Sequence, residues 1–243
     1  MQYIGNNQIT AKYVGNTEVQ KQYLGDTLVW EKEQPTPSGP PNNEIWYTTT
    51  DGNIITISNT SLTITSNTYV DGKGVLVFDS DVISLPQRYL GWQSTLTSLT
   101  LPQSLTGFGN YCFSTNTAMT SIAGLENVVS VGIGSFQSCN SLLNVELPAA
   151  SGSVNSAFGS CGSLTSVTLG YVTSIEQSCF YGCGVIDSIT FFTETPPTVG
   201  ANGWSWDGTM KGTGTFYVPA NAVSAYATWK SGRVANWTVQ AIS

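Results

Sequence analysis

Apolar and polar residues alternate along this chain in short segments that recur at a regular distance. From residue 96 onward the recurring segments are 96–102, 119–122, 142–148, 164–169 and 186–191. A phenylalanine recurs in phase with them: Phe113, Phe136, Phe158 and Phe180. Alternation with period two predicts short strands that are buried on one face. The segments recur every 22 to 23 residues. One coil of this length cannot bury its apolar face alone, so we expect five or six coils to stack into a β-solenoid.

The spacing L-x-x-L-x-L within a unit of about 22 residues is the signature of a leucine-rich-repeat solenoid. In each coil the L-x-L segment predicts a strand of a parallel sheet, and the phenylalanine packs into the shared interior from the opposite wall. Three apolar residues fall one period before the first full coil, in phase with the pattern: Leu76, Phe78 and Leu90. They predict a degenerate, capping-like first coil.

A second and shorter period occupies residues 2–30. Tyr3, Tyr13 and Tyr23 recur with a strict period of ten, each followed two positions later by glycine. Each unit predicts a strand, a Gly-Asn or Gly-Asp turn and a second strand, and together they predict a small β meander. About thirty residues cannot bury a core of their own. We therefore expect this module to dock onto a partner or onto copies of itself, with packing against the rest of the chain as the alternative.

Proline separates the two repeat regions: Pro35, Pro37, Pro40 and Pro41. Such a run predicts an extended, semi-rigid spacer that holds two modules apart. The polar helix-compatible segment 221–230 predicts a short terminal helix. The expected domains are an N-terminal β-repeat anchoring module, a Pro-rich linker, an N-terminal cap with the degenerate first repeat, the leucine-rich-repeat solenoid and a C-terminal cap, at residues 1–30, 31–43, 44–95, 96–195 and 196–243.

The composition argues against an enzyme and against nucleic-acid binding. Charged residues make up 9% of the chain, against roughly 25% in an average soluble protein, and there is no histidine. Ser-His-Asp catalysis, Cys-His catalysis and imidazole zinc sites are thereby excluded. The net charge is −7, and no basic residue lies between Arg88 and Lys211, so phosphate groups have little to bind. No apolar run reaches the length of a membrane span.

The start of the chain shows no basic segment followed by an apolar one, so we expect no secretory signal. If this start is the natural one, we expect the protein to be made and kept in a cytosol, or to leave it by lysis. The alternative is a chain that has been trimmed of its signal.

The spacing of the cysteines predicts a row of thiols along the solenoid and not a metal site. Cys139, Cys161 and Cys183 recur with the period of the coils, each three positions after a repeat phenylalanine. Their side chains would point the same way, the cysteine total of five is odd, and no CxxC pair occurs. We therefore expect free, buried thiols and no zinc. The acidic segment 79–81, with Asp71 nearby, lacks the full calcium-loop pattern and predicts a solvated turn. No metal and no cofactor is expected.

Two rows of residues should face outward from the predicted sheet. The first is Ser98, Ser121, Asn144, Ser166 and Ser188, and the second is Thr100, Ala123, Glu146, Thr168 and Thr190. This face lacks an aromatic platform, which makes it a weak saccharide-binding candidate. Trp204 and Trp206 lie in the Gly-rich loop 200–208 and are candidate ligand contacts, with closure of the solenoid core as the alternative. Trp229 and Trp237 are assigned to the C-terminal cap.

Specific segments resemble the BspA-type leucine-rich repeats. Residues 128–139 and 172–183 match a consensus that runs V-T-S-I-G and then A-F-x-x-C. Two departures are visible, since Asn116 replaces the consensus cysteine and 151–155 replaces V-T-S-I-G. The segment 43–52 resembles the opening of such proteins from gut Bacteroidales and their phages. The resemblance implies a β-rich solenoid of BspA-type repeats, with the small β meander before it.

The end of the chain, including Phe216 to Pro219, Tyr226 and Trp237, resembles the closing cap of the same family. It implies a C-terminal cap that contains a short helix. The N-terminal repeats, which end at Trp30, are similar to segments at the head of virion proteins of crAss-like and related Bacteroidales phages.

The second resemblance implies a non-enzymatic virion structural protein, such as a head or tail fibre, a spike or a decoration subunit. It would be anchored to other virion proteins through Tyr3, Tyr13, Tyr23 and Trp30. Its repeat domain would adhere to a cell-surface glycan or protein receptor. A homo-oligomer is expected. Fibre proteins in general are trimers, so the resemblance implies a trimer. The alternative is a bacterial cell-surface adhesin or protein-interaction module of BspA type.

Overall fold

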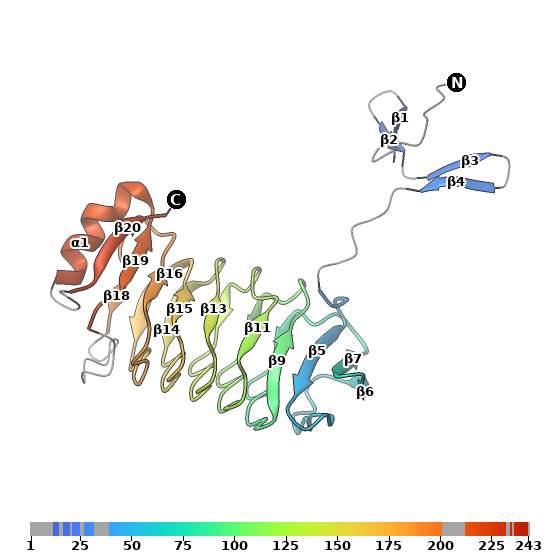
Figure 1. Cartoon of the computed structure of the whole chain (residues 1–243), viewed down its shortest axis with the longest axis horizontal. Coiled ribbons are helices and arrows are strands. Elements are labelled where there is room, and N and C mark those ends of the chain that lie inside the picture. The colour runs from blue at the N-terminus through green and yellow to red at the C-terminus, as the bar shows by residue number, and fades with distance from the viewer. Residues whose placement is uncertain are drawn as a thin grey trace. The chain divides into compact units, whose positions relative to one another are not determined.

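The computed structural model describes residues 39–200, 212–231, 234 and 236–242 and, ahead of these, the backbone of four strands. The chain divides into two compact units, Met1–Ser38 and Gly39–Ser243. The larger unit is a β-solenoid of about six coils (Figure 1). Its strands run side by side along the coils, and α1 (Val223–Ser231) is the one α-helix in the described part of the chain.

The smaller unit contains two antiparallel hairpins. β1 (Lys12–Val14) pairs with β2 (Thr17–Val19), and β3 (Lys21–Leu24) pairs with β4 (Thr27–Glu31). These are the strands predicted for the second and third ten-residue units. Among the described strands, each hairpin forms a two-stranded sheet of its own, where one continuous meander was expected. The pairing of each unit closes locally across its own turn, so it does not require a neighbouring unit.

The first wall of the solenoid consists of short parallel strands, one for each coil (Figure 1). The five predicted L-x-L segments form β9 (Leu96–Thr100), β11 (Ser121–Ala123), β13 (Asn144–Glu146), β15 (Ser166–Thr168) and β17 (Ser188–Thr190). Equivalent residues of successive coils pair, for example Val145 with Val167 and Val167 with Ile189. The predicted parallel sheet is therefore confirmed.

Two further strands from the C-terminal region continue this wall. β19 (Thr215–Val218) pairs parallel with β17, and β20 (Thr238–Ala241) pairs parallel with β19. The helix α1 connects them after a single turn of 3₁₀-helix, Ala220–Ala222. The predicted helix is confirmed, with its start two positions later than expected. Trp237 is buried with its ring centroid 4.8 Å from that of Phe216, which confirms its assignment to the cap.

The second wall consists of six strands in two three-stranded parallel sheets. They are β8 (Ser84–Leu85), β10 (Gly107–Phe108), β12 (Ser130–Val131), β14 (Ser151–Asn155), β16 (Tyr171–Glu176) and β18 (Thr198–Val199). Within this wall, a Cβ atom on Gly132 would collide with the backbone of Gly109 in the preceding coil. Glycine is required there because the two backbones approach each other too closely for any side chain.

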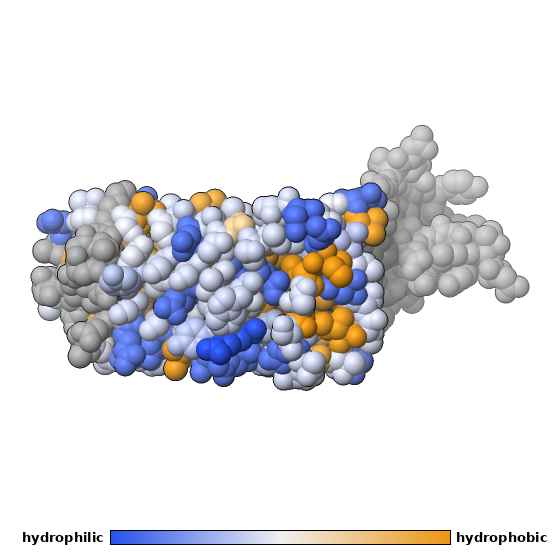
Figure 2. Space-filling model, turned by 90° about the horizontal axis from the view of Figure 1, so that it is seen from below, coloured by the Kyte–Doolittle hydropathy of each residue, from blue (hydrophilic) through white to orange (hydrophobic). Residues whose placement is uncertain are grey.

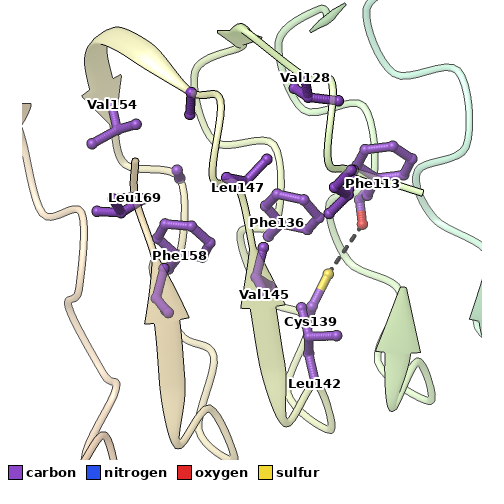
Figure 3. Close-up of a cluster of buried hydrophobic side chains, with 14 of the residues drawn as sticks. Phe113, Val128, Phe136, Cys139, Leu142, Val145, Leu147, Val154, Phe158 and Leu169 are labelled. Carbon is purple, nitrogen blue, oxygen red and sulfur yellow. Dashed lines mark hydrogen bonds between the residues drawn. The ribbon is translucent and has the colours of Figure 1, made fainter. Parts of the chain in front are cut away.

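The repeat phenylalanines lie outside the strands of the first two walls, on a third side of each coil that we call the phenylalanine wall, and their side chains point into the interior. The rings of Phe113, Phe136, Phe158 and Phe180 form one stack, with centroids 5.3, 5.6 and 5.5 Å apart. Figure 3 shows the first three rings among leucine and valine side chains, including Val145 of β13 and Val154 of β14. All four are fully buried. Burial of apolar area in this shared core is the main favourable term that holds the coils together.

The first coil differs from its prediction. β5 (Glu44–Thr49) pairs antiparallel with β9 on one side and with β7 (Lys73–Phe78) on the other. β6 (Ile64–Val70) completes the sheet beyond β7. An upstream strand thus covers the edge that the parallel strands would otherwise expose to other chains. Terminal units of solenoids need such caps because they have no neighbour on one side.

As a consequence, Leu76 and Phe78 do not stack directly on the parallel strand β9. Tyr47 of β5 lies opposite Leu99 instead, and Leu76 is one strand further away. Leu90 does occupy the predicted position of the repeat phenylalanine. Its backbone amide donates to the carbonyl oxygen of Cys112 in the next coil at 2.9 Å, just as the amide of Phe113 donates to the carbonyl oxygen of Ser135. The prediction of a degenerate first coil is therefore correct for the phenylalanine wall and wrong for the sheet.

The end of the Pro-rich segment belongs to this first coil. The backbone amides of Phe78 and Val82 donate to the carbonyl oxygens of Asn43 and Asn42, at 2.9 and 2.8 Å. Pro40 is buried. Residues 39–43 therefore pack as part of the solenoid unit, although the proline content of this segment predicted a spacer.

The cysteine row has a structural role. The thiols of Cys139, Cys161 and Cys183 each donate to the carbonyl oxygen of a phenylalanine in the preceding coil, with a sulfur to oxygen distance of 3.1 Å. Figure 3 shows the first of these bonds, from Cys139 to Phe113. The row therefore satisfies one buried backbone acceptor in each coil.

Asn116 takes the place of the cysteine in the first full coil and makes the equivalent bond. Its amide nitrogen Nδ2 donates to the carbonyl oxygen of Leu90 at 2.8 Å. Its Oδ1 also accepts from the backbone amide of Gln93 at 2.8 Å. The departure from the repeat consensus thus preserves the donor and adds an acceptor.

We expect Asn116→Ala to lower the free energy of unfolding by about 2–4 kcal/mol. The substitution leaves a buried carbonyl and a partly buried amide without partners, and each such group costs about 1–3 kcal/mol. Urea denaturation followed by tryptophan fluorescence measures the change. The exposed Asn127, which donates to Gln103, provides the control, and Asn127→Ala should cost less than about 1 kcal/mol. Equal losses for both variants would contradict this role for Asn116.

Candidate interaction surface

The groups that could carry covalent or metal chemistry are buried or scattered. All five cysteines are free and buried. Burial raises the pKa of Cys112, Cys139, Cys179 and Cys183 to about 12, so these thiols are protonated and poor nucleophiles at neutral pH. Within the part of the chain that the structure describes, no three residues of the types His, Cys, Asp and Glu are grouped to hold a metal ion. In the same residues, no helix is long and apolar enough to span a membrane.

The outer face of the first wall is a regular surface that repeats from coil to coil. Because side chains alternate along a strand, the residues on either side of each buried central residue point outward. The register places the two predicted rows in line, with Asn144 beside Ser166 and Ser188, and Glu146 beside Thr168 and Thr190. The two rows therefore form ladders along the wall. The first carries a hydroxyl or amide group in every coil, and the second carries a hydroxyl or carboxylate group in every coil except at Ala123.

The outer face extends beyond the five coils at both ends. At its start, Thr48 of β5 hydrogen-bonds through Oγ1 to the hydroxyls of Thr97 and Ser98, both at 2.6 Å. At the other end, Thr215 and Thr238 share a hydroxyl hydrogen bond of 2.9 Å. These bonds orient the hydroxyl side chains at the two ends of the face.

Aromatic side chains also stand at both ends of the face. Trp46 lies opposite Thr100 in the register, with the Lys73 ammonium 3.1 Å from its ring centroid and its Nε1 donating to Glu44 at 2.8 Å. Tyr217 lies opposite Thr190. The expectation of a face without aromatics is correct for the five coils and wrong for the sheet as a whole. Trp46 was missed because β5 pairs antiparallel and lies outside the repeat.

The structure does not test the site residues predicted from the sequence. Trp204 and Trp206 lie outside the described residues, as does Tyr3. For Tyr13, Tyr23 and Trp30 only the backbone, in β1, β3 and β4, is described. Their proposed anchoring and ligand contacts therefore stay predictions.

A comparison with protein-family models confirms what the repeat spacing and motifs indicate. The model described as the BspA type leucine rich repeat region matches residues 76–201 in six copies, which is just over half of the chain. The chain belongs to the BspA-type leucine-rich repeat family. Its matched region begins on β7, so the family unit includes part of the antiparallel cap. Proteins with these repeats are typically non-catalytic interaction modules.

Two solved structures resemble this BspA-type chain. One is a leucine rich cell surface protein from Faecalibacterium prausnitzii, 16% identical, which covers 67% of this chain, with a TM-score of 0.31. This chain spans 57% of the length of that protein. The other is a leucine-rich repeat protein from Bacteroides ovatus, 17% identical, covering 72% of this chain and 67% of its own, with a TM-score of 0.22. A search of curated proteins returns no match.

Proposed function

We propose that this chain is a non-catalytic adhesion module that binds a protein partner through the outer face of its first wall. The observation that carries the proposal is the pair of ladders of mainly polar side chains along the two adjoining sheets of the first wall, with Trp46 on β5 and Tyr217 on β19. Seven parallel strands at about 4.8 Å make this face about 30 Å long. Hydroxyl and amide ladders provide hydrogen bonds, and aromatic groups at the ends provide apolar contact.

The N-terminal unit would then be the anchor. We propose that residues 1–30 attach the chain to other virion proteins, so that the solenoid acts as a fibre, spike or decoration subunit. The division into two units and the hairpins of the smaller unit support this arrangement. A bacterial cell-surface adhesin fits the solenoid equally well. Mass spectrometry of purified phage particles and of bacterial surface fractions distinguishes the two roles by where residues 1–30 are retained.

We expect Ser166→Arg to weaken binding of the labelled chain to Bacteroidales cells by about tenfold. Ser166 lies at the middle of the outer face, where a long charged side chain would separate the partner from both ladders. Flow cytometry measures binding, and protease treatment of the cells should abolish it if the partner is a protein.

The control variant is Ser153→Arg, which places the same charge on exposed β14 in the second wall. It should bind within about twofold of the unchanged chain. Thermal melts should be alike for both variants. Equal binding by Ser166→Arg and Ser153→Arg would remove the outer face from consideration as the binding surface.

A further inference from the structure

A pocket of about 750 Å³ opens on the first coil, away from the ladder residues of the outer face. The segment from Thr56 to Asn59 forms one side of it, and the segment from Gln87 to Gln93 forms the other. Figure 2 shows that apolar surface gathers at this end of the solenoid, while the remaining coils are mainly polar on that side. Ile54, which is 54% exposed, is among the exposed apolar residues of the first coil.

Two large side chains of this pocket occupy backbone positions that favour small residues. Arg88 has φ 58° and Trp92 has φ 59°, both in the left-handed region. The same two positions are left-handed in later coils. The position of Arg88 is held by Tyr111 in the next coil and then by Gly134, Ser156 and Ser178, and the position of Trp92 is held by small residues throughout: Thr115, Ser138, Ser160 and Gly182. Bulky residues are disfavoured in this conformation.

Packing does not account for either side chain. Trp92 is 52% exposed, so it contributes little to the core. The repeat geometry needs only the left-handed backbone, because the amide of Trp92 donates to Ser114 just as the amide of Thr115 donates to Gln137. A large exposed aromatic and a guanidinium at these positions therefore indicate a binding role.

Arg88 is positioned by rings and not by carboxylates. Its guanidinium carbon lies 5.2 Å from the ring centroid of Trp92 and 5.6 Å from that of Tyr111. Tyr111 can lie there because Gly134, in the next coil, has no Cβ to collide with its ring. Among the described residues Arg88 makes no ion pair, although acidic residues outnumber basic ones by 15 to 8 in the whole chain. Its charge is therefore available to an anionic ligand.

The rest of the pocket is polar and already held in place. Gln93 donates from Nε2 to the carbonyl oxygen of Thr56 at 2.8 Å. Asn59 donates from Nδ2 to the carbonyl oxygen of Gln87 at 3.0 Å. Because these two bonds join the opposite sides of the pocket, its shape exists before any ligand binds, which lowers the entropic cost of binding.

We propose that this pocket binds a carboxylate-bearing pyranose of an acidic polysaccharide. The Trp92 ring would stack on the C–H face of the sugar, and the Arg88 guanidinium would pair with its carboxylate. The hydroxyl and amide groups of Ser58, Asn59 and Gln93 would bind the sugar hydroxyls. A single guanidinium between two rings suits a planar carboxylate on a sugar ring. The site is separate from the protein-binding face proposed above.

The experiment compares matched probes by isothermal titration calorimetry and saturation-transfer NMR. The probes are trigalacturonate and its methyl ester, and 3′-sialyllactose and lactose. We expect the carboxylate member of at least one pair to bind about tenfold more tightly than its neutral partner, with affinity falling as salt is raised. The pair that shows this difference identifies the source of the carboxylate as a uronic or a sialic acid.

Two variants take the residues that other coils use at these positions. Arg88→Ser should remove the preference for the carboxylate, and Trp92→Ser should weaken binding of the preferred probe by about tenfold, with thermal stability unchanged or raised. The exposed Tyr181→Ser is the control and should bind like the unchanged chain. Absence of binding by all four probes, equal affinity within both pairs, or unchanged binding by both pocket variants would each overturn the proposal. Ser166→Arg should bind these sugars normally, which separates this test from that of the outer face.

Discussion

Phe136→Ala is expected to lower the free energy of unfolding of the solenoid by about 3–5 kcal/mol. The ring is fully buried and lies between those of Phe113 and Phe158, with centroids 5.3 and 5.6 Å away. Its removal loses apolar burial and three ring contacts, the third being the edge-on contact with Phe108 at 5.6 Å, and leaves a cavity in the middle of the stack. Urea denaturation monitored by circular dichroism measures the loss.

The control for this substitution keeps the same coil and changes an exposed side chain. Ile133 is 41% exposed, so Ile133→Ala should cost less than about 1 kcal/mol. Phe136→Leu should fall between the two, because leucine fills part of the ring volume. A loss below about 1 kcal/mol for Phe136→Ala would show that neighbouring coils collapse onto the vacant space, and would contradict a rigid stack.

The repeat could be predicted from the sequence because each of its positions recurs in register. The phenylalanine row, the cysteine row and the two outer rows were all assigned from spacing, and the parallel pairing of β13, β15 and β17 places them as predicted. Stacking converts a sequence period directly into spatial neighbours, since residues that are one repeat apart lie in adjacent coils. The fold could therefore be predicted from the sequence, even though many of its contacts join residues that are far apart in the chain.

The structure of the two ends of the solenoid was harder to predict from the sequence, because the ends do not follow the repeat. β5 pairs antiparallel with β9, although β6, β7 and β8 lie between them in the sequence. The repeat period therefore does not predict this pairing. β19 and β20 continue the parallel sheet, yet α1 and the loops around it make their spacing irregular. Trp46 and Tyr217, the aromatic ends of the outer face, were missed for this reason.

The pocket at Arg88 and Trp92 was missed for a different reason. Both residues are in phase with the repeat, but spacing alone does not reveal a left-handed backbone at their positions. A signal was available at Trp92, since the equivalent positions in later coils are glycine, serine and threonine, whereas the position of Arg88 is held by Tyr111 in the next coil and by small residues only after it. A large residue at a position that is otherwise small is a departure that can be searched for in any repeat protein.

Raising the pH from 8 to 10 is expected to destabilise the solenoid by about 1.4 kcal/mol for each of four buried thiols. Burial raises the folded-state pKa of Cys112, Cys139, Cys179 and Cys183 from 9.0 to about 12. A raised pKa means that the unfolded chain releases these protons first. The stability from the neutral thiols is fully present below pH 9 and is lost as the pH rises from 9 toward 12.

The four contributions together reach about 5 kcal/mol at pH 10, which is comparable with the whole stability of an ordinary domain. Urea midpoints at pH 8, 9 and 10 measure the loss, with the chain kept reduced throughout. Cys183→Ala provides the matched control: it lowers stability at pH 8 through the lost bond to Phe158, but its further loss by pH 10 should be smaller by one thiol's share, about 1.4 kcal/mol. An equal pH dependence in both chains would mean that Cys183 ionises as readily in the folded solenoid as in the unfolded chain. That result would contradict the tightly packed cysteine row, because a thiolate could be tolerated there only if water entered between the coils.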